Sequence, residues 1–133
     1  MSVWGASLIA LFTWWFATGL ILLVIRSADR TGGNAYNRAV FFAVPVLALG
    51  VAGVILSTSD ATLIGLYKGF FGALAIWGWI ELSFLSGVIT GPERADRPDG
   101  VSGTDRFWRA WDALAYHEVL LLAGLAFIVI ATT

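Results

Sequence analysis

Cysteine is absent from this 133-residue chain, and histidine occurs once, at His117. Without cysteine there can be no disulfide framework, thiolate metal site or cysteine nucleophile. A single histidine excludes a multi-histidine metal site within the chain, although a partner chain could supply further ligands. Hydrolase, kinase, nucleotide-binding and metalloprotease motifs are also missing from the sequence. These absences predict a protein that is not an enzyme.

Charge is scarce as well. Only 13% of the residues are Asp, Glu, Lys or Arg, whereas 59% are hydrophobic. A soluble domain usually carries about 25% charged residues to cover its surface. The formal net charge of −1 argues against electrostatic binding to nucleic acid. The composition therefore predicts an integral membrane protein whose surface faces lipid.

Long apolar runs are what the sequence does contain. A helix of about 20 residues crosses the roughly 30 Å hydrocarbon core of a bilayer. We expect an all-α membrane bundle, one domain over 1–133, with a cytoplasmic loop at 91–105 and about four transmembrane helices at 3–25, 39–56, 62–90 and 108–131. Basic residues follow the first run instead of preceding it, which favours a span over a cleaved signal peptide. Pro45 predicts a kink in the second span.

The arginines indicate the orientation of these spans. They all lie in two segments, Arg26–Arg38 and Arg94–Arg109, whereas the N-terminus and the turn at 57–60 have no Lys or Arg. The positive-inside rule then places both arginine segments in the cytoplasm and both chain termini outside. Lys68 is the exception, and it is expected to snorkel to the outer interface.

Two kinds of residue suggest how the helices pack and sit in the membrane. Gly65, Gly69 and Ala73 form a ridge of small residues on the third span, and Ala48 and Ala52 do the same on the second. Such ridges let helix backbones approach closely. Packing within the bundle is the favoured interpretation, and docking onto another membrane subunit is the alternative. At the start of the last span, Trp108 and Trp111 are expected to anchor the helix at the interface.

Three ionisable residues lie at a matching depth inside predicted spans: Glu81, His117 and Glu118. Such residues are costly in a membrane, and functional by default. Helical rise puts Glu81 about 13 Å from the cytoplasmic end of its span. His117 and Glu118 lie at a similar depth on the antiparallel neighbour, so a Glu81–His117 hydrogen bond is geometrically allowed.

Three interpretations of this cluster compete. The favoured one is a polar pair that fixes helix register and contributes about 1 kcal/mol. The second is a ligand site, in which the His117 imidazole binds the magnesium of a chlorophyll-type pigment beside Glu81 and Glu118. The third is proton transfer, but the sequence offers no further intramembrane acid that would extend a proton path.

Four tryptophans also lie deep in their spans, where packing is favoured over contact with a ring system or polyene: Trp14, Trp15, Trp77 and Trp79.

Several short motifs resemble a known family. They are Thr13-Trp14-Trp15-Phe16-Ala17-Thr18-Gly19, then Trp77-Gly78-Trp79-Ile80-Glu81 with Gly91-Pro92 after it, and finally Tyr116-His117-Glu118. Together they resemble the photosynthetic complex assembly protein 2 family, also called PuhE, whose members are multi-spanning membrane proteins of purple-type phototrophic bacteria. Family members are longer, so this chain is expected to correspond to their amino-terminal half. The resemblance transfers no catalytic residue.

The resemblance implies a non-enzymatic assembly or accessory protein of the reaction-centre and light-harvesting complex, in the intracytoplasmic photosynthetic membrane. Its expected partners are reaction-centre or antenna membrane subunits and lipid. The alternative hypothesis is a pigment carrier or pigment-binding subunit that holds bacteriochlorophyll or carotenoid, with His117 as the magnesium ligand. A small transporter would require inverted repeats, and the sequence shows no convincing repeat.

Overall fold

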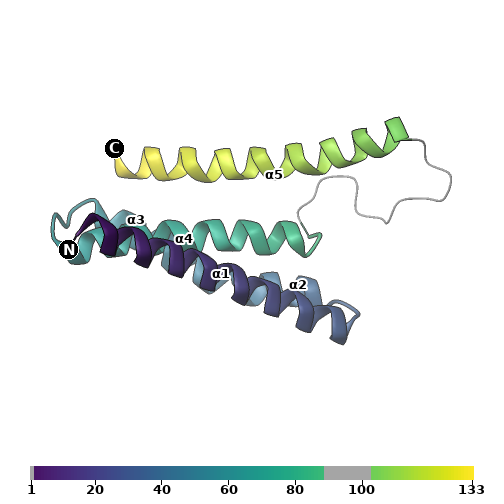
Figure 1. The fold of residues 1–133 in the computed structure, drawn as a ribbon, viewed down its shortest axis with the longest axis horizontal. Helices are drawn as coiled ribbons and strands as arrows, with labels where there is room; N and C mark the ends of the chain where they lie inside the picture. Colours follow the sequence, from purple (N-terminus) through teal and green to yellow (C-terminus); the bar gives the residue numbers. More distant parts are fainter. Residues whose placement is uncertain (1, 89–102) are drawn as a thin grey trace.

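The computed structural model describes residues 2–88 and 103–133. Within these ranges the chain is helical and contains no strand. The helices are α1 (Val3–Thr31), α2 (Ala35–Phe42), α3 (Val44–Ser57), α4 (Leu63–Leu85) and α5 (Gly103–Thr132) (Figure 1). Because α2 and α3 together make one span, the described residues provide 4 helical segments that are long and apolar enough to cross a membrane. The expected all-α membrane fold is therefore confirmed.

α1 is longer than the expected span 3–25, because polar residues continue the helix beyond its apolar part. α1 runs past Arg26 to Thr31 and ends where Gly32 and Gly33 adopt φ values of 69° and 61°. Positive φ is costly for residues with a Cβ, so these glycines suit the helix end. Ser2 precedes α1 and caps it, because its hydroxyl accepts a hydrogen bond from the Gly5 N–H at 3.1 Å.

The connection between α4 and α5 also departs from the expected boundaries. α4 ends at Leu85, before the expected residue 90, and Gly87 follows with a φ of 74°. α5 starts at Gly103, so residues 103–105 are helical and do not belong to a loop. The remainder of the expected loop, 91–102, lies outside the described residues. Neither helix end was visible in the hydropathy pattern, because α4 stops within apolar sequence and α5 starts within polar sequence.

The expected break at Pro45 is present. α2 ends at Phe42, and α3 begins at Val44 with proline in its first turn. Proline has no N–H to donate to the preceding turn, so the backbone bonds of a continuous helix are not all made here. The Trp79 indole Nε1 donates a hydrogen bond to the Val40 carbonyl at 3.3 Å and ties the break to α4. Satisfaction of a backbone carbonyl by a neighbouring helix is what permits a broken helix within a membrane.

α3 and α4 make the closest helix pair. A Cβ added to Gly50 would lie 2.8 Å from the Gly72 carbonyl oxygen, and one added to Gly72 would lie 2.6 Å from the Gly50 carbonyl oxygen. The two backbones therefore touch at a point where any side chain would clash. Beside this crossing lies the hydrophobic core, formed by Val54, Ile76 and Ile80.

The predicted ridge on the third span faces the inside of the bundle. Gly69 lies against Ser57, Gly65 lies beneath Asp60, and Ala73 packs against the core. Packing within the bundle is therefore confirmed for this ridge. For the ridge on the second span, packing within the bundle was the wrong interpretation, because Ala48 and Ala52 are exposed. Their four-residue spacing defines a helix face but does not show which face meets α4.

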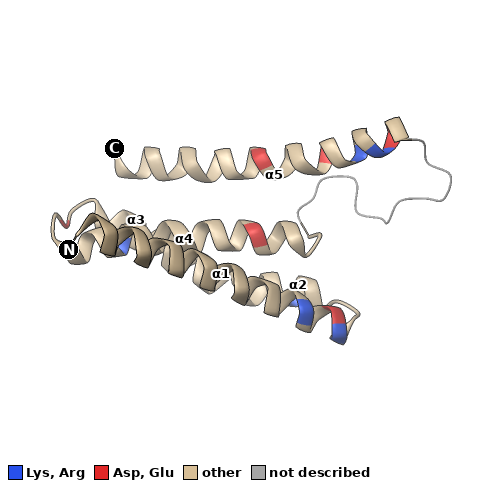
Figure 2. Cartoon of the chain, in the orientation of Figure 1, with Lys and Arg blue, Asp and Glu red and all other residues tan. Residues whose placement is uncertain are grey.

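Charges gather at the two ends of the bundle. Figure 2 shows charged residues at the end of α1 and in the first turns of α5, at one end of the bundle. Lys68 lies near the other end, where it contacts Asp60 in the α3–α4 turn. The chain termini lie at the end opposite the described arginines, beside the α3–α4 turn (Figure 1). This arrangement matches the expected distribution of the arginine segments. Which end faces the cytoplasm stays a prediction.

Candidate functional site

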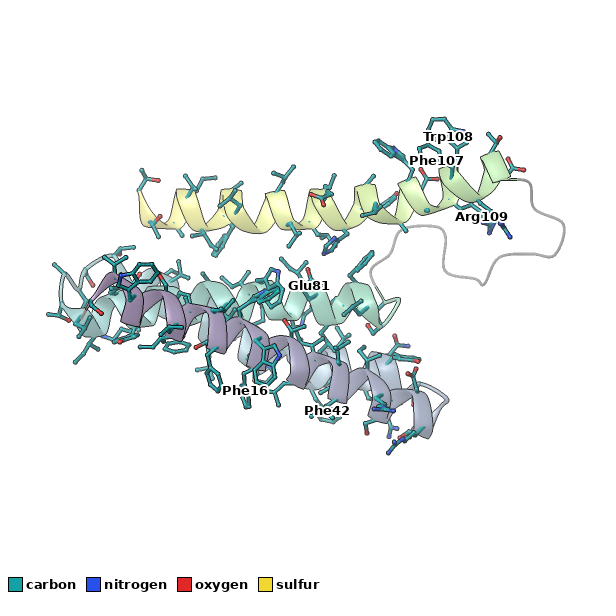
Figure 3. All side chains as sticks on the ribbon, in the orientation of Figure 1. Phe16, Phe42, Glu81, Phe107, Trp108 and Arg109 are labelled. Atoms are coloured by element: carbon teal, nitrogen blue, oxygen red, sulfur yellow. The ribbon has the colours of Figure 1, made fainter. Side chains whose placement is uncertain are left out.

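The Glu81–His117 pair joins the third and fourth spans. His117 Nε2 lies 2.8 Å from Glu81 Oε1, and the two side chains are 15% and 17% exposed. Glu81 points from α4 toward α5, as Figure 3 shows. An ionised Glu81 carboxylate accepts a hydrogen bond from Nε2–H, whereas a protonated carboxyl would donate a hydrogen bond to an unprotonated Nε2. The hydrogen bond that the sequence allowed is thus formed in the structure.

A stacked ring and a close helix approach complete the contact between α4 and α5. The rings of Phe84 and His117 stack with centroids 4.3 Å apart and an interplanar angle of 28°. Two turns further along α5, a Cβ on Gly124 would lie 3.0 Å from the Ile80 side chain. α5 therefore meets α4 at two levels, one polar and aromatic and the other apolar, which together fix its register.

The pair lies closer to the helix end than the sequence suggested. Because α4 ends at Leu85, Glu81 is only 85 − 81 = 4 residues from that end, or about 6 Å by helical rise. The expected distance of about 13 Å rested on a helix that reached residue 90. The difference follows from Ser86 and Gly87, which end α4 inside the apolar run.

Glu118 does not join the pair. Successive residues on an α-helix point about 100° apart, so His117 can face α4 while its neighbour turns away. Glu118 is exposed, and among the described residues it makes no hydrogen bond or ion pair. The sequence placed both residues at a matching depth, but it could not show which of them would face α4.

This geometry restricts how His117 can bind a pigment magnesium, because only Nδ1 is left outside the bond to Glu81. Axial ligation of a magnesium requires a ring nitrogen with a free lone pair and open space in front of it. Nε2 is engaged by Glu81, and one face of the ring is covered by Phe84. Ligation through Nε2 would require the Glu81 bond to break. In residues 2–88 and 103–133, no group of three or more His, Asp or Glu side chains is placed to hold a metal ion.

The deep tryptophans divide into two groups. Trp79 donates to the Val40 carbonyl, and Trp77 lies beside Trp14 with ring centroids 6.4 Å apart. Packing against neighbours is confirmed for Trp77 and Trp79, whereas Trp14 contacts Trp77 but is 50% exposed. Trp15 differs, because it is 65% exposed and points out of the bundle near Phe12. At the start of α5, Trp108 and Trp111 are both exposed, and their role as interface anchors stays a prediction.

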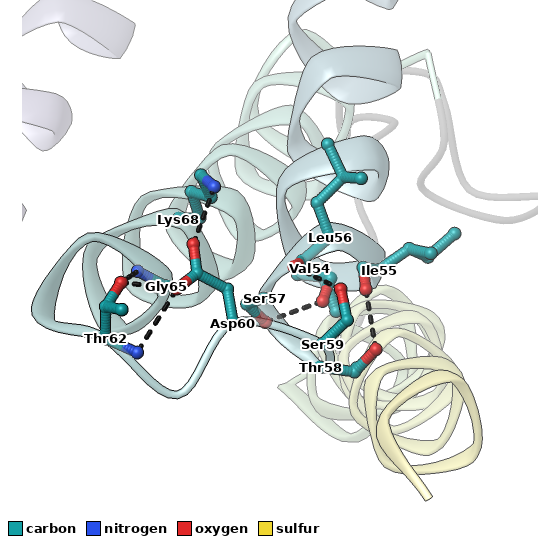
Figure 4. A network of polar contacts seen from close by, with 10 residues as sticks. All are labelled: Val54, Ile55, Leu56, Ser57, Thr58, Ser59, Asp60, Thr62, Gly65 and Lys68. Carbon is teal, nitrogen blue, oxygen red and sulfur yellow. Dashed lines mark hydrogen bonds and ion pairs between the residues drawn. The ribbon is translucent and has the colours of Figure 1, made fainter.

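A second polar cluster lies at the opposite end of the bundle, in the α3–α4 turn (Figure 4). Lys68 Nζ lies 2.8 Å from Asp60 Oδ2, so the lysine reaches back to the turn as expected for a snorkelling side chain. Asp60 also accepts hydrogen bonds from the Thr62 backbone N–H and hydroxyl. The Lys68 ammonium, followed by these Thr62 bonds, lowers the pKa of Asp60 from 3.8 to about 2.

The Asp60–Lys68 pair was missed at the sequence level. Its two residues are eight positions apart and lie on opposite sides of a helix start. Only the chain reversal between α3 and α4 brings them together. A usable signal was nevertheless present, because Lys68 is an isolated lysine in an apolar span and Asp60 is the nearest acid in the sequence.

Comparison with known proteins identifies the family. Residues 1–133 match the family described as a protein of unknown function, DUF3623. The chain belongs to this family. It is also 41% identical over 122 residues to an uncharacterized 30.4 kDa protein in the puhA 5′ region of Rhodobacter capsulatus. This match covers 92% of the chain but 44% of that relative. No solved structure matches the chain.

Proposed function

We propose that this DUF3623 protein is a non-enzymatic assembly or accessory factor of the photosynthetic membrane complex. One observation carries the proposal: the 41% identity to the Rhodobacter capsulatus protein, whose name places it in the puhA 5′ region. That gene neighbourhood suggests a link to a photosynthesis gene cluster. The motifs around Trp14, Trp79 and His117 that resemble a photosynthetic assembly family support the same assignment.

The physical character of the surface supports a binding role. α5 has no buried residue, and α1 buries only Ala28. Large exposed apolar surfaces on a membrane protein face either lipid or other transmembrane helices. The proposed partners are reaction-centre or antenna subunits that contact these outer helices. The proposed location is the bacterial inner membrane and its intracytoplasmic extensions.

Affinity purification tests the proposal directly. The chain, tagged at one terminus, is expressed in phototrophically grown cells of its source, and the membranes are solubilised in mild detergent. We expect reaction-centre or antenna subunits to co-purify in excess over a tagged, unrelated four-span membrane protein. Recovery without any photosynthetic subunit or pigment-synthesis enzyme would contradict the proposal.

The pigment-binding alternative has a sharper test. Absorption spectra of the purified protein and of His117→Ala would be compared at equal protein concentration. Because Glu81 bonds His117 Nε2 and Phe84 stacks on the ring, we expect any co-purified pigment to keep its spectrum in His117→Ala. A pigment absorption band lost in that variant and retained in Glu118→Ala would favour the pigment-binding function.

A further inference from the structure

α5 presents a second face that its own bundle leaves uncovered. Its inner face contacts the core through Leu120, Leu121 and Ile128, and contacts α4 through His117. On a flank of the helix, a row of apolar side chains recurs at three- or four-residue spacing, each more than half exposed: Phe107, Trp111, Leu114, Leu122, Leu125 and Val129. Glu118 stands in the middle of this row, four residues after Leu114 and four before Leu122.

A carboxyl group on this face has a high energetic cost. In an apolar environment a carboxylate loses its hydration, and a protonated carboxyl still leaves a donor and an acceptor unsatisfied. Two other carboxyls, one in the α3–α4 turn and one within α4, avoid this cost. Asp60 contacts the Lys68 ammonium and Glu81 contacts the His117 imidazole. Glu118 has no such nitrogen base among residues 2–88 and 103–133.

We propose that the Glu118 face of α5 docks a transmembrane helix of a partner protein that carries a basic side chain at the depth of Glu118. The apolar residues above and below Glu118 would pack against the partner helix, while the ion pair would set its register. A charge-assisted hydrogen bond is the strongest way to satisfy a carboxylate in an apolar environment. A single buried polar contact of this kind also specifies one register among many apolar ones.

A second copy of the chain does not meet this requirement. Two copies in the same orientation, related by an axis along the membrane normal, bring like residues to the same depth. Glu118 would then lie level with another Glu118. The nitrogen bases inside the spans are already engaged, because His117 bonds Glu81 and Lys68 bonds Asp60 at the far end of the bundle. The proposed source of the basic group is therefore a helix of a partner protein.

This inference rests on the proposed function for the nature of the partner, a membrane subunit, but its test is independent of photosynthesis. The protein is reconstituted in phosphatidylcholine vesicles and labelled through a single introduced cysteine, Ser59→Cys, which is unique because the chain has no native cysteine. The probe is a synthetic leucine–alanine transmembrane peptide with one lysine at the depth of Glu118, and the control peptide carries leucine there. Energy transfer between the two labels measures association.

We expect the lysine peptide to associate about tenfold more tightly than the leucine peptide, the range typical of a membrane-embedded polar contact. Glu118→Leu should abolish the preference, and Glu118→Asp should retain most of it. Asp112→Leu is the matched control, because Asp112 is also an exposed carboxyl on α5 but lies outside the row. Glu118→Leu should fold normally, since Glu118 has no internal contact to lose; circular dichroism checks this.

Two outcomes would overturn the proposal. One is equal association of both peptides with the wild-type protein, or an unchanged preference in Glu118→Leu. The other is energy transfer between labelled copies without peptide that Glu118→Leu removes, because the face would then be a homodimer interface. Either result leaves the co-purification test of the proposed function unaffected.

Discussion

His117 and Glu118 are neighbours in sequence with opposite surroundings. His117 bonds Glu81 and stacks on Phe84, whereas Glu118 is exposed on the flank of the same helix. Glu118 can therefore serve as the control when the stabilising contribution of the Glu81–His117 pair is measured. A buried polar contact between membrane helices typically contributes about 0.6–2 kcal/mol, because the unfolded chain in the membrane also finds partners.

A double-mutant cycle measures this contribution. The free energies of unfolding of wild type, His117→Ala, Glu81→Ala and the double variant would be determined in mixed micelles with increasing SDS. We expect a coupling energy of about 1 kcal/mol between residues 81 and 117. The same cycle with Glu118→Ala and His117→Ala should give a value near zero. Equal coupling in both cycles would contradict the observed contact.

Asp60 makes stability dependent on pH at the other end of the bundle. Its pKa is about 2 in the folded protein, below its ordinary value of 3.8, mainly because Lys68 bonds the carboxylate. The stabilisation is therefore fully present above pH 3.8 and is lost as the pH falls through about 2. The free energy of unfolding of wild type should exceed that of Asp60→Asn at pH 6, and the difference should shrink over this window. A pH-independent difference would be the contrary result.

At the scale of elements, the number of membrane spans and their helical structure could be predicted from the sequence, but the contacts between the helices could be predicted only in part. Apolar runs of the right length predict spans because lipid demands them. The spacing of small residues correctly indicated the inward-facing Gly65–Ala73 ridge, but the same spacing at Ala48 and Ala52 marks an exposed face. Gly50 and Gly72 were not singled out, since which glycines meet depends on the rotation and crossing of both helices. The exposure of Glu118 depends in the same way on the rotation of α5.

The α3–α4 crossing can be tested with matched glycine substitutions. Gly72→Ala places a Cβ 2.6 Å from the Gly50 carbonyl oxygen, whereas a Cβ at Gly19 meets nothing within 4 Å. Both substitutions gain the same helix propensity, so their difference isolates the clash. We expect Gly72→Ala to be about 1–3 kcal/mol less stable than Gly19→Ala in SDS unfolding. Equal stabilities would mean that the helices separate at no cost.

At the scale of the whole molecule, the two ends of the bundle differ in charge. The described arginines, at the end of α1, in α2 and in the first turns of α5, lie at one end, and both termini lie with the α3–α4 turn at the other (Figures 1 and 2). The positive-inside rule predicts that the arginine end is cytoplasmic. That orientation is also required for any partner helix to meet Glu118 on the cytoplasmic side of the membrane.

Single-cysteine labelling tests this orientation. The cysteine-free chain allows Ser2→Cys, Thr31→Cys and Ser59→Cys to be labelled one at a time with a membrane-impermeant maleimide. In spheroplasts we expect Ser2→Cys and Ser59→Cys to react, and Thr31→Cys to react only after permeabilisation. The reverse pattern would invert the topology and place the Asp60–Lys68 turn in the cytoplasm.

The mutual contact of Gly50 and Gly72 has a consequence for how such proteins can evolve. Neither position can take a residue with a side chain, because a Cβ at either one would clash with the backbone carbonyl of the other glycine. In most helix contacts a larger residue on one side can be accommodated by a smaller one on the other. Here both positions already hold the smallest residue, so no exchange between them can restore the fit. A lineage that lost one of these glycines would have to move the two helices apart, and Trp79, which bridges α4 to the break before α3, would have to move with them.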